Sequence, residues 1–255
     1  MFRVVIPARH ASTRLPGKPL LPLAGEPMIL HVHRLALRAG AAEVIVATDD
    51  ERIRAACRAA GAEVEMTSAH HASGTDRIAE VAARRGWADG DIVVNLQGDE
   101  PMLPPALVAQ SANLLAATPA ASIATLATPI AGESEYLDPN VVKVVARPDG
   151  IALYFSRAPV PWDRDGFAVT PPAADRHRGA RRHLGIYAYR TAALRRLASA
   201  PPADLERRER LEQLRALAMG LAIVVADAVE LPGPGVDTPE DLARVDALLR
   251  AAGRR

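Results

Sequence analysis

Three cationic residues lie in a short segment that directly follows the first apolar stretch of the chain. The segment 9–18 contains Arg9, Arg14 and Lys18, together with a Pro-Gly pair that stiffens the backbone. Cationic side chains in such a loop can hold phosphate oxygens, although a solvated turn with scattered arginines is the alternative. A P-loop requires a glycine where Ser12 stands, and the G-x-G-x-x-G pattern is absent. The sequence therefore predicts a phosphate-binding loop of a third kind.

Two acidic residues lie in segments that suit a metal site. Asp99 belongs to the motif "QGDEP", and Asp237 belongs to "PGPGVDTPEDL" near the end of the chain. In the second motif, helix capping explains Thr238 as the N-cap and Asp241 at N3, but it leaves Asp237 unexplained. For Asp99 alone, a role in a turn or a cap is an equally good explanation. Two carboxylates beside a cationic loop fit a nucleoside triphosphate bound with Mg²⁺.

Strand-like and helix-like stretches alternate through the first half of the chain, as in a doubly wound, mostly parallel α/β sheet. In such sheets the ligand binds beyond the carboxyl ends of the strands. The predicted strands are 2–8, 43–50, 63–66, 91–101 and 122–130. The predicted helices are 27–40, 51–61, 74–86 and 104–118. The loops that this rule selects are 7–19, 48–50, 67–77 and 97–101.

The second half of the chain has a different pattern. It predicts a hairpin at 141–157 around an Arg-Pro-Asp-Gly turn, and a polar, Arg-rich surface loop at 163–182. The remaining predicted elements are a strand at 183–190, a helix from about 191, a helix at 204–219, a strand at 222–229 and a helix at 237–253.

Composition excludes several classes of protein. The net charge of +1 provides no field to attract nucleic acid or an acidic membrane surface. With no signal peptide and no long apolar run, the sequence predicts a cytoplasmic protein. Cys57 is expected to be a small buried hydrophobe. The histidines lack the spacing of zinc ligands and are expected to be structural: His10, His31, His33, His70 and His71.

Seven motifs, in order from residue 3 to about residue 245, resemble those of the 3-deoxy-D-manno-octulosonate (Kdo) cytidylyltransferase family. The opening loop and "QGDEP" alone indicate only a sugar-activating nucleotidyltransferase. The motifs "LYFSRAPVPWDRD" and "RHLGIYAYR" are specific to this family. The others are "PARHASTRLPGKPL", "GTDR", "VNLQGDEP", "LEQLR" and "PGPGVDTPEDL".

The resemblance implies the Mg²⁺-dependent reaction CTP + Kdo → CMP-Kdo + pyrophosphate, a step in lipopolysaccharide assembly. It also implies a homodimer, and a single domain of residues 1–255 in which 130–190 is a smaller inserted subdomain for sugar binding and dimer contact. The implied nucleotide-binding residues are Arg9, Ser12, Thr13, Lys18, Arg77 and Gln97. The implied metal ligands are Asp99 and Asp237, which join Arg9 and Lys18 as the catalytic residues. The implied sugar-binding residues are Arg157, His183, Tyr187, Glu212 and Gln213.

Two other functions are compatible with parts of this pattern. A sialic-acid cytidylyltransferase would also join CTP to a keto-acid sugar, but its opening loop and sugar motifs differ from these. A catalytically silent nucleotide-binding subunit could share the fold. The presence of Lys18, Asp99 and Asp237 argues against a silent subunit, because a pure binder would not need metal ligands.

Overall fold

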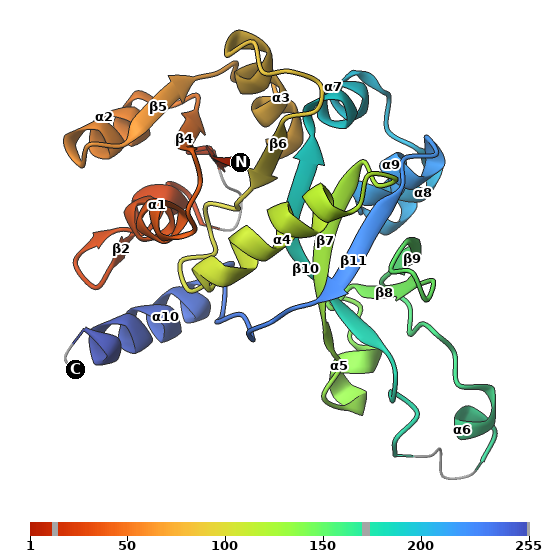
Figure 1. Cartoon of the computed structure of the whole chain (residues 1–255). Helices are drawn as coiled ribbons and strands as arrows, with labels where there is room; N and C mark the ends of the chain where they lie inside the picture. The colour runs from red at the N-terminus through yellow and green to blue at the C-terminus, as the bar shows by residue number, and fades with distance from the viewer. Residues whose placement is uncertain (12–14, 170–173, 254–255) are drawn as a thin grey trace.

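A largely parallel sheet forms the centre of the molecule. The computed structural model describes residues 1–11, 15–169 and 174–253. The strands of the main sheet follow the order β11-β7-β10-β6-β1-β4-β5, and β8 and β9 extend it from β10 (Figure 1). The strands of that order are β1 (Phe2–Ala8), β4 (Glu43–Thr48), β5 (Glu63–Met66), β6 (Ile92–Asn95), β7 (Ile123–Pro129), β10 (Arg181–Arg190) and β11 (Ile223–Asp227).

One strand of this order runs against the others. β10 is antiparallel to both of its neighbours, β6 and β7, whereas β1 is parallel to β4 and β6, and β11 is parallel to β7. The predicted α/β class with a mostly parallel sheet is confirmed. The reversed strand matters for the site. Because β10 runs antiparallel to β6, Tyr187 in β10 lies opposite Asn95 at the carboxyl end of β6.

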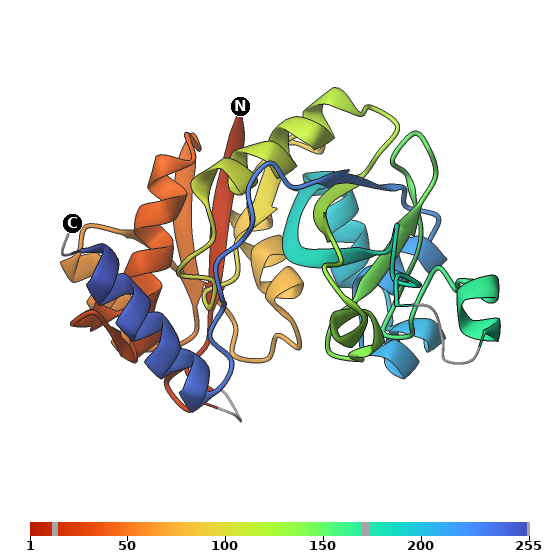
Figure 2. The ribbon, with the colours of Figure 1, turned by 90° about the horizontal axis from the view of Figure 1, so that it is seen from below.

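Helices cover both faces of the sheet, as the doubly wound pattern predicts (Figure 2). On one face, apolar side chains of β1, β4 and β6 pack against helices from the first half of the chain and form one core. These helices are α1 (Met28–Arg38), α2 (Glu51–Ala59) and α4 (Pro105–Ala117). The alternate residues of the same strands pack against the helices of the other face. Those helices are α3 (Gly74–Arg84), α7 (Thr191–Ser199) and α9 (Gln213–Ala218).

The C-terminal helix α10 (Pro239–Ala252) lies beside α1 in both views of the molecule (Figures 1 and 2). Its Val245 packs with Leu23 and Met28 in a small separate core. Leu23 belongs to a short hairpin of β2 (Pro22–Leu23) and β3 (Glu26–Pro27), which follows the single turn η1 (Lys18–Leu20). The sequence did not predict this hairpin, and Pro27 precedes α1 as its N-cap rather than as its first residue.

A smaller substructure extends from the β10 side of the sheet. It consists of α5 (Glu133–Leu137), β8 (Lys143–Ala146), β9 (Ala152–Ser156) and α6 (Arg164–Ala168). The hairpin predicted at 141–157 is confirmed as the antiparallel pair β8 and β9. The segment 130–190, predicted to be an inserted subdomain, thus contains these elements and also β10, which belongs to the main sheet. The boundaries of that subdomain stay a prediction.

A buried lysine ties this substructure together. Lys143 is fully buried. Its ammonium group donates hydrogen bonds to the carbonyl oxygens of Asp138, Val141 and Arg157 at 2.8, 2.6 and 2.8 Å. These bonds join the segment before β8 to the end of β9, and burial lowers the pKa of this lysine. One of the two lysines of the chain is therefore structural, and the other lies in the opening loop.

One prediction about the second half was wrong and another was incomplete. The helix expected at 204–219 is two helices, α8 (Asp204–Glu209) and α9, separated at Arg210, where φ is 53°. The break has a physical reason. No residue of α8 is buried, whereas Leu211 and residues of α9 pack into the core, so the chain must change direction between the two helices. The loop expected at 163–182 contains α6, whose Asp163 N-cap accepts a hydrogen bond from the Gly166 N–H.

Candidate active site

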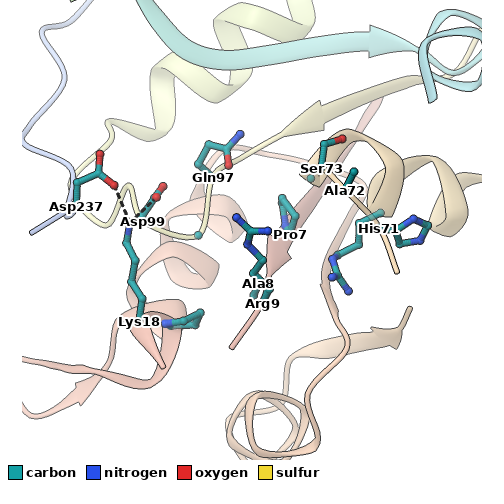
Figure 3. Close-up of a pocket in the computed structure, with 14 residues that line it drawn as sticks. Pro7, Ala8, Arg9, Lys18, His71, Ala72, Ser73, Gln97, Asp99 and Asp237 are labelled. Atoms are coloured by element: carbon teal, nitrogen blue, oxygen red, sulfur yellow. Dashed lines mark hydrogen bonds and ion pairs between the residues drawn. The ribbon is translucent and has the colours of Figure 1, made fainter. Parts of the chain in front are cut away.

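One lysine holds two carboxylates together at the edge of the sheet. The ammonium nitrogen of Lys18 lies 2.7 Å from Asp99 Oδ2 and 3.0 Å from Asp237 Oδ1, as the dashed lines of Figure 3 show. The lysine side chain is only 12% exposed, whereas those of Asp99 and Asp237 are 37% and 53% exposed, so the carboxylates remain open to a ligand. Residues from the start, middle and end of the chain thus converge on one charge cluster, as the sequence predicted for a ligand site.

A left-handed turn places Lys18. Gly17 has φ of 68° and donates its N–H to the carbonyl of His10 at 3.0 Å. A Cβ atom at this position would lie 3.0 Å from His10 Nε2, so both the backbone conformation and the space favour glycine. Its carbonyl accepts from the Leu20 N–H at 2.8 Å and closes the turn η1. The Pro-Gly pair therefore aims the lysine along the edge of the sheet.

Backbone contacts place Asp237 beside Asp99. The N–H of Val236 donates to the carbonyl of Asp99 at 2.9 Å, and the N–H of Gly233 donates to the carbonyl of Met102 at 3.3 Å. At Gly233 a Cβ atom would lie 2.6 Å from Met102 Cβ, so only glycine permits this close approach. The segment from β11 to α10 is thereby fastened along the loop that carries Asp99.

The helix that follows Asp237 is capped as predicted. Thr238 Oγ1 accepts from the Asp241 N–H, and the Asp241 carboxylate accepts from the Thr238 N–H, which completes a capping box. The same carboxylate also accepts from the Asp237 N–H at 3.1 Å. The cap thus fixes the backbone of Asp237 while its side chain points to Lys18.

The charge cluster borders a cavity of about 260 Å³ at the carboxyl ends of β1 and β6 (Figure 3). Gly74 and Arg77 of α3 also line it, where α3 begins. All the nucleotide-binding and catalytic residues that were predicted and that the structure describes line this cavity: Arg9, Lys18, Arg77, Gln97, Asp99 and Asp237. Ser12 and Thr13, which were predicted to bind the triphosphate, lie outside the described residues.

The two arginines of this cavity differ in their surroundings. Arg9 is exposed. Arg77 is buried, and its guanidinium donates to Asp49 Oδ2 at 2.8 Å and to the Thr67 hydroxyl. Arg77 is therefore held rigidly by its neighbours, whereas Arg9 can turn toward a ligand.

A third carboxylate lies behind the cluster. Burial, together with the negative charges of Asp99 and Asp237, raises the pKa of Glu100 to about 7. Glu100 lines a second cavity of about 460 Å³, which is bordered by β10 and by the segment that leads to α10. Glu100 belongs to the motif "QGDEP", but no role was predicted for it, because its burial depends on segments that are distant in the chain.

The predicted sugar-binding residues are divided between cavities. His183 lines the second cavity, whereas Tyr187, Glu212 and Gln213 line a third cavity of about 160 Å³. Arg157 lines none of the three cavities, because its guanidinium donates to the carbonyls of Glu209 and Pro139 at 2.7 and 2.9 Å.

Gln97 connects these spaces. It lines all three cavities, and it stands just beyond the carboxyl end of β6. The first and third cavities also share Gly74, at the start of α3. The arrangement can therefore hold one ligand over the cationic cavity and a second one against β10, with their ends meeting near Gln97.

Sequence reasoning missed several lining residues. His71 and Ser73 line the first cavity directly before the "GTDR" motif, and Asn95 and Tyr189 line the third cavity. The position of His71 next to that motif was the only available signal for it. Asn95 was read as part of a strand, because its neighbours Val93 and Val94 are apolar.

His183 is held as a neutral ring among aromatic and hydroxyl groups. Its ring lies 5.0 Å from the ring of Phe155 and 5.2 Å from that of Tyr187 between centroids. Its Nε2 lies 3.0 Å from the hydroxyl oxygen of Thr125. Burial lowers the pKa of His183 from 6.5 to about 3. A neutral histidine can offer a ligand a hydrogen bond without adding charge.

The chain matches the family model described as cytidylyltransferase over residues 3–223. It is 57% identical to the 3-deoxy-manno-octulosonate cytidylyltransferase of Halorhodospira halophila, over 98% of this chain and 97% of that protein. It is 56% identical to the protein of the same name from Thioalkalivibrio sulfidiphilus, over 98% and 99% of the two chains. A solved structure, CMP:2-keto-3-deoxy-manno-octonic acid synthetase complexed with CTP, superposes with a TM-score of 0.88 at 44% identity, over 99% of this chain and all of that one.

The depressed pKa of His183 predicts a loss of stability in mild acid. The unfolded state binds a proton near pH 6.5, whereas the folded state resists protonation until about pH 3. The free energy of unfolding should therefore fall by about 1.4 kcal/mol per pH unit as pH drops from about 6.5 to 5. In His183→Gln, the free energy of unfolding measured with urea should fall less steeply between pH 7 and 5, because this contribution is absent.

The matched control is His70→Gln, which replaces an exposed histidine. This variant should keep the slope of the unmodified protein. Equal slopes in all three proteins would contradict the burial of a neutral His183.

Proposed function

The chain belongs to the 3-deoxy-manno-octulosonate (Kdo) cytidylyltransferase family, and from this premise we propose that it transfers CMP from CTP to Kdo and releases pyrophosphate. This step would supply CMP-Kdo to lipopolysaccharide assembly in the cytoplasm, where the nucleotide pool lies. One observation carries the proposal: Lys18, Asp99 and Asp237 meet at the edge of a cavity that Arg9 and Arg77 also line. That edge lies at the carboxyl ends of the strands, where ligands bind in such sheets.

The reaction asks for positioning and charge neutralisation. The anomeric hydroxyl of the sugar attacks the α-phosphorus, a new P–O bond forms, and the bond to the β-phosphate breaks as pyrophosphate leaves. The hydroxyl gives up its proton to water in this step. Arg9 and Lys18 are the cations placed to stabilise the charge on the departing phosphates. No side-chain nucleophile is required for such a direct transfer.

Asp99 and Asp237 fit a site for Mg²⁺. Oxygens of both carboxylates already converge within 3.0 Å of a single cationic atom, Lys18 Nζ. Mg²⁺ prefers oxygen ligands, and it commonly takes one or two carboxylates together with substrate phosphates. Within the described parts of the chain no larger group of acidic, histidine or cysteine ligands occurs, so the phosphates would complete the set. Bound there, Mg²⁺ would polarise the α-phosphate and lower the pKa of the attacking hydroxyl.

The sugar would lie on the β10 side of Gln97. Tyr187, Glu212 and Gln213 offer hydrogen-bonding groups to a polyhydroxylated ligand in the third cavity, and His183 offers a neutral ring in the second. Arg157 was predicted to bind the sugar, but its guanidinium is held by two carbonyls. We propose that it instead supports the end of β9.

We also propose that the protein is a homodimer, joined through the substructure of α5, β8, β9 and α6. Large apolar side chains are exposed there, which is typical of an interaction surface. These are Leu137, Leu153, Trp162 and Val169. Light scattering should give the mass of a dimer, and Leu153→Arg should give a monomer. Leu248→Arg, at an exposed leucine of α10, is the control and should stay dimeric. A monomeric unmodified protein would refute the proposal.

The proposed reaction predicts the outcome of a substrate panel. Purified protein with CTP and Mg²⁺ should release pyrophosphate with Kdo, and not with N-acetylneuraminate or without sugar. Chelation of the metal should abolish release, and added Mg²⁺ should restore it. Release with neuraminate alone would favour a sialic-acid cytidylyltransferase. Binding of CTP without release in any mixture would favour a silent nucleotide-binding subunit, and either result would overturn the proposal.

A further inference from the structure

The third cavity, of about 160 Å³, contains an unusual polar residue. A cavity needs roughly 10–15 Å³ to hold one water molecule, so this space has room for a much larger group. Asn95 lines it at the carboxyl end of β6, a strand whose other residues are Ile92, Val93 and Val94. Only 2% of Asn95 is exposed. A polar side chain buried at the end of an apolar strand needs a hydrogen-bonding partner.

Strand pairing shows which way Asn95 points. It lies directly opposite Tyr187 in the antiparallel pair of β6 and β10. Residues that face each other across such a pair project on the same side of the sheet, and so does the next alternate residue, Tyr189. This is the side that α3 and α9 cover. The amide of Asn95 therefore points to the same face as the two tyrosines that line the cavity.

The hydrogen bonding of Asn95 is incomplete. Its side-chain amide interacts with the Tyr189 hydroxyl. Its other polar atom, Oδ1, is buried and has no hydrogen-bonding partner among the residues that the structure describes. An unpaired buried acceptor destabilises a fold, so its retention at a cavity wall points to a partner that arrives from outside.

Glu212 is a second acceptor that lines the same cavity. The Glu212 carboxylate accepts a hydrogen bond from the Thr75 hydroxyl at the start of α3, where a negative charge is favoured. A carboxylate has capacity for further donors after this bond. Burial raises the pKa of Glu212, which agrees with a group shielded from bulk water. Asn95 and Glu212 thus present two acceptors to the cavity, beside the hydroxyl and amide groups of Tyr187, Tyr189 and Gln213.

We propose that Asn95 is a specificity-determining residue, whose Oδ1 accepts a hydrogen bond from a hydroxyl group of the sugar substrate. Together with Glu212 it makes a subsite that binds hydrogen-bond donors and repels anions. The hydroxyl-bearing end of the sugar therefore enters this cavity, and the sugar carboxylate stays outside it, on the side of Arg9 and Lys18. This inference rests on the proposed function and adds a residue and an orientation to it.

A structural role for Asn95 would have different consequences from a ligand-binding role. If Asn95 served only to hold Tyr189, its replacement would lower the melting temperature and would affect all substrates equally. If its oxygen instead binds the sugar, an apolar replacement should weaken Kdo binding specifically, because it removes the acceptor that the sugar hydroxyl would use.

The first experiment compares Asn95→Val with Thr48→Val. Thr48 is a matched control, since it is fully buried in β4 but its hydroxyl accepts from the Asp50 N–H at 3.2 Å. Asn95→Val should stay folded, raise the KM for Kdo about tenfold and leave the KM for CTP unchanged. Thr48→Val should lower the melting temperature and leave both KM values unchanged. An Asn95→Val protein that unfolds, or that keeps its KM for Kdo, would overturn the inference.

The second experiment uses Kdo analogues that each lack one hydroxyl group. For one of them, the unmodified enzyme should lose about tenfold in kcat/KM, and Asn95→Val should lose almost nothing further. An equal loss from Asn95→Val with Kdo and with every analogue would show a structural role and overturn the inference alone. Absence of turnover by the unmodified enzyme with Kdo would overturn the proposed function, and this inference with it.

Discussion

The site depends on one electrostatic constraint: two carboxylates from distant segments must lie side by side without repelling each other. Asp99 and Asp237 satisfy it by sharing the ammonium group of Lys18 at 2.7 and 3.0 Å. A cation between two carboxylates offsets the repulsion that would otherwise oppose bringing them together. Burial is the main reason for the raised pKa of the neighbouring Glu100, and the negative charges of Asp99 and Asp237 add to it. The two carboxylates therefore share one cationic group in this structure, and the proposed metal-bound triphosphate would place further cations beside them.

The backbone enforces this arrangement. Gly17 adopts a left-handed turn that aims Lys18, and Gly233 lets the segment before α10 approach Met102 closely enough for Val236 to bond the carbonyl of Asp99. Around this cluster, residues of β1 and α3 and of the loop after β6 line the first cavity, while the reversed strand β10 supplies the tyrosines of the third cavity. The topology of the sheet thus joins two binding spaces at Gln97.

Local sequence patterns predicted what depends on local physics. Strand and helix periodicity gave the α/β class, the capping box at Thr238 was confirmed, and the motifs placed Lys18, Asp99 and Asp237 at the sheet edge. Features that depend on long-range packing escaped prediction. The helix break at Arg210 follows from the burial of Leu211. Arg157 is held by the carbonyls of Glu209 and Pro139, which are distant from it in the sequence. Likewise, nothing local distinguishes Asn95 from an ordinary strand residue.

The most direct test of the account is a double-mutant cycle on the rate of cytidylyl transfer, with Asp99→Asn, Asp237→Asn and the double variant. The account treats the two carboxylates as one cation-binding unit, and groups that act as a unit are strongly non-additive. Each single substitution should therefore lower kcat by roughly 10²–10³-fold, and the double variant should lose little more. Losses that multiply in the double variant, or a single variant with nearly full activity, would contradict the shared site.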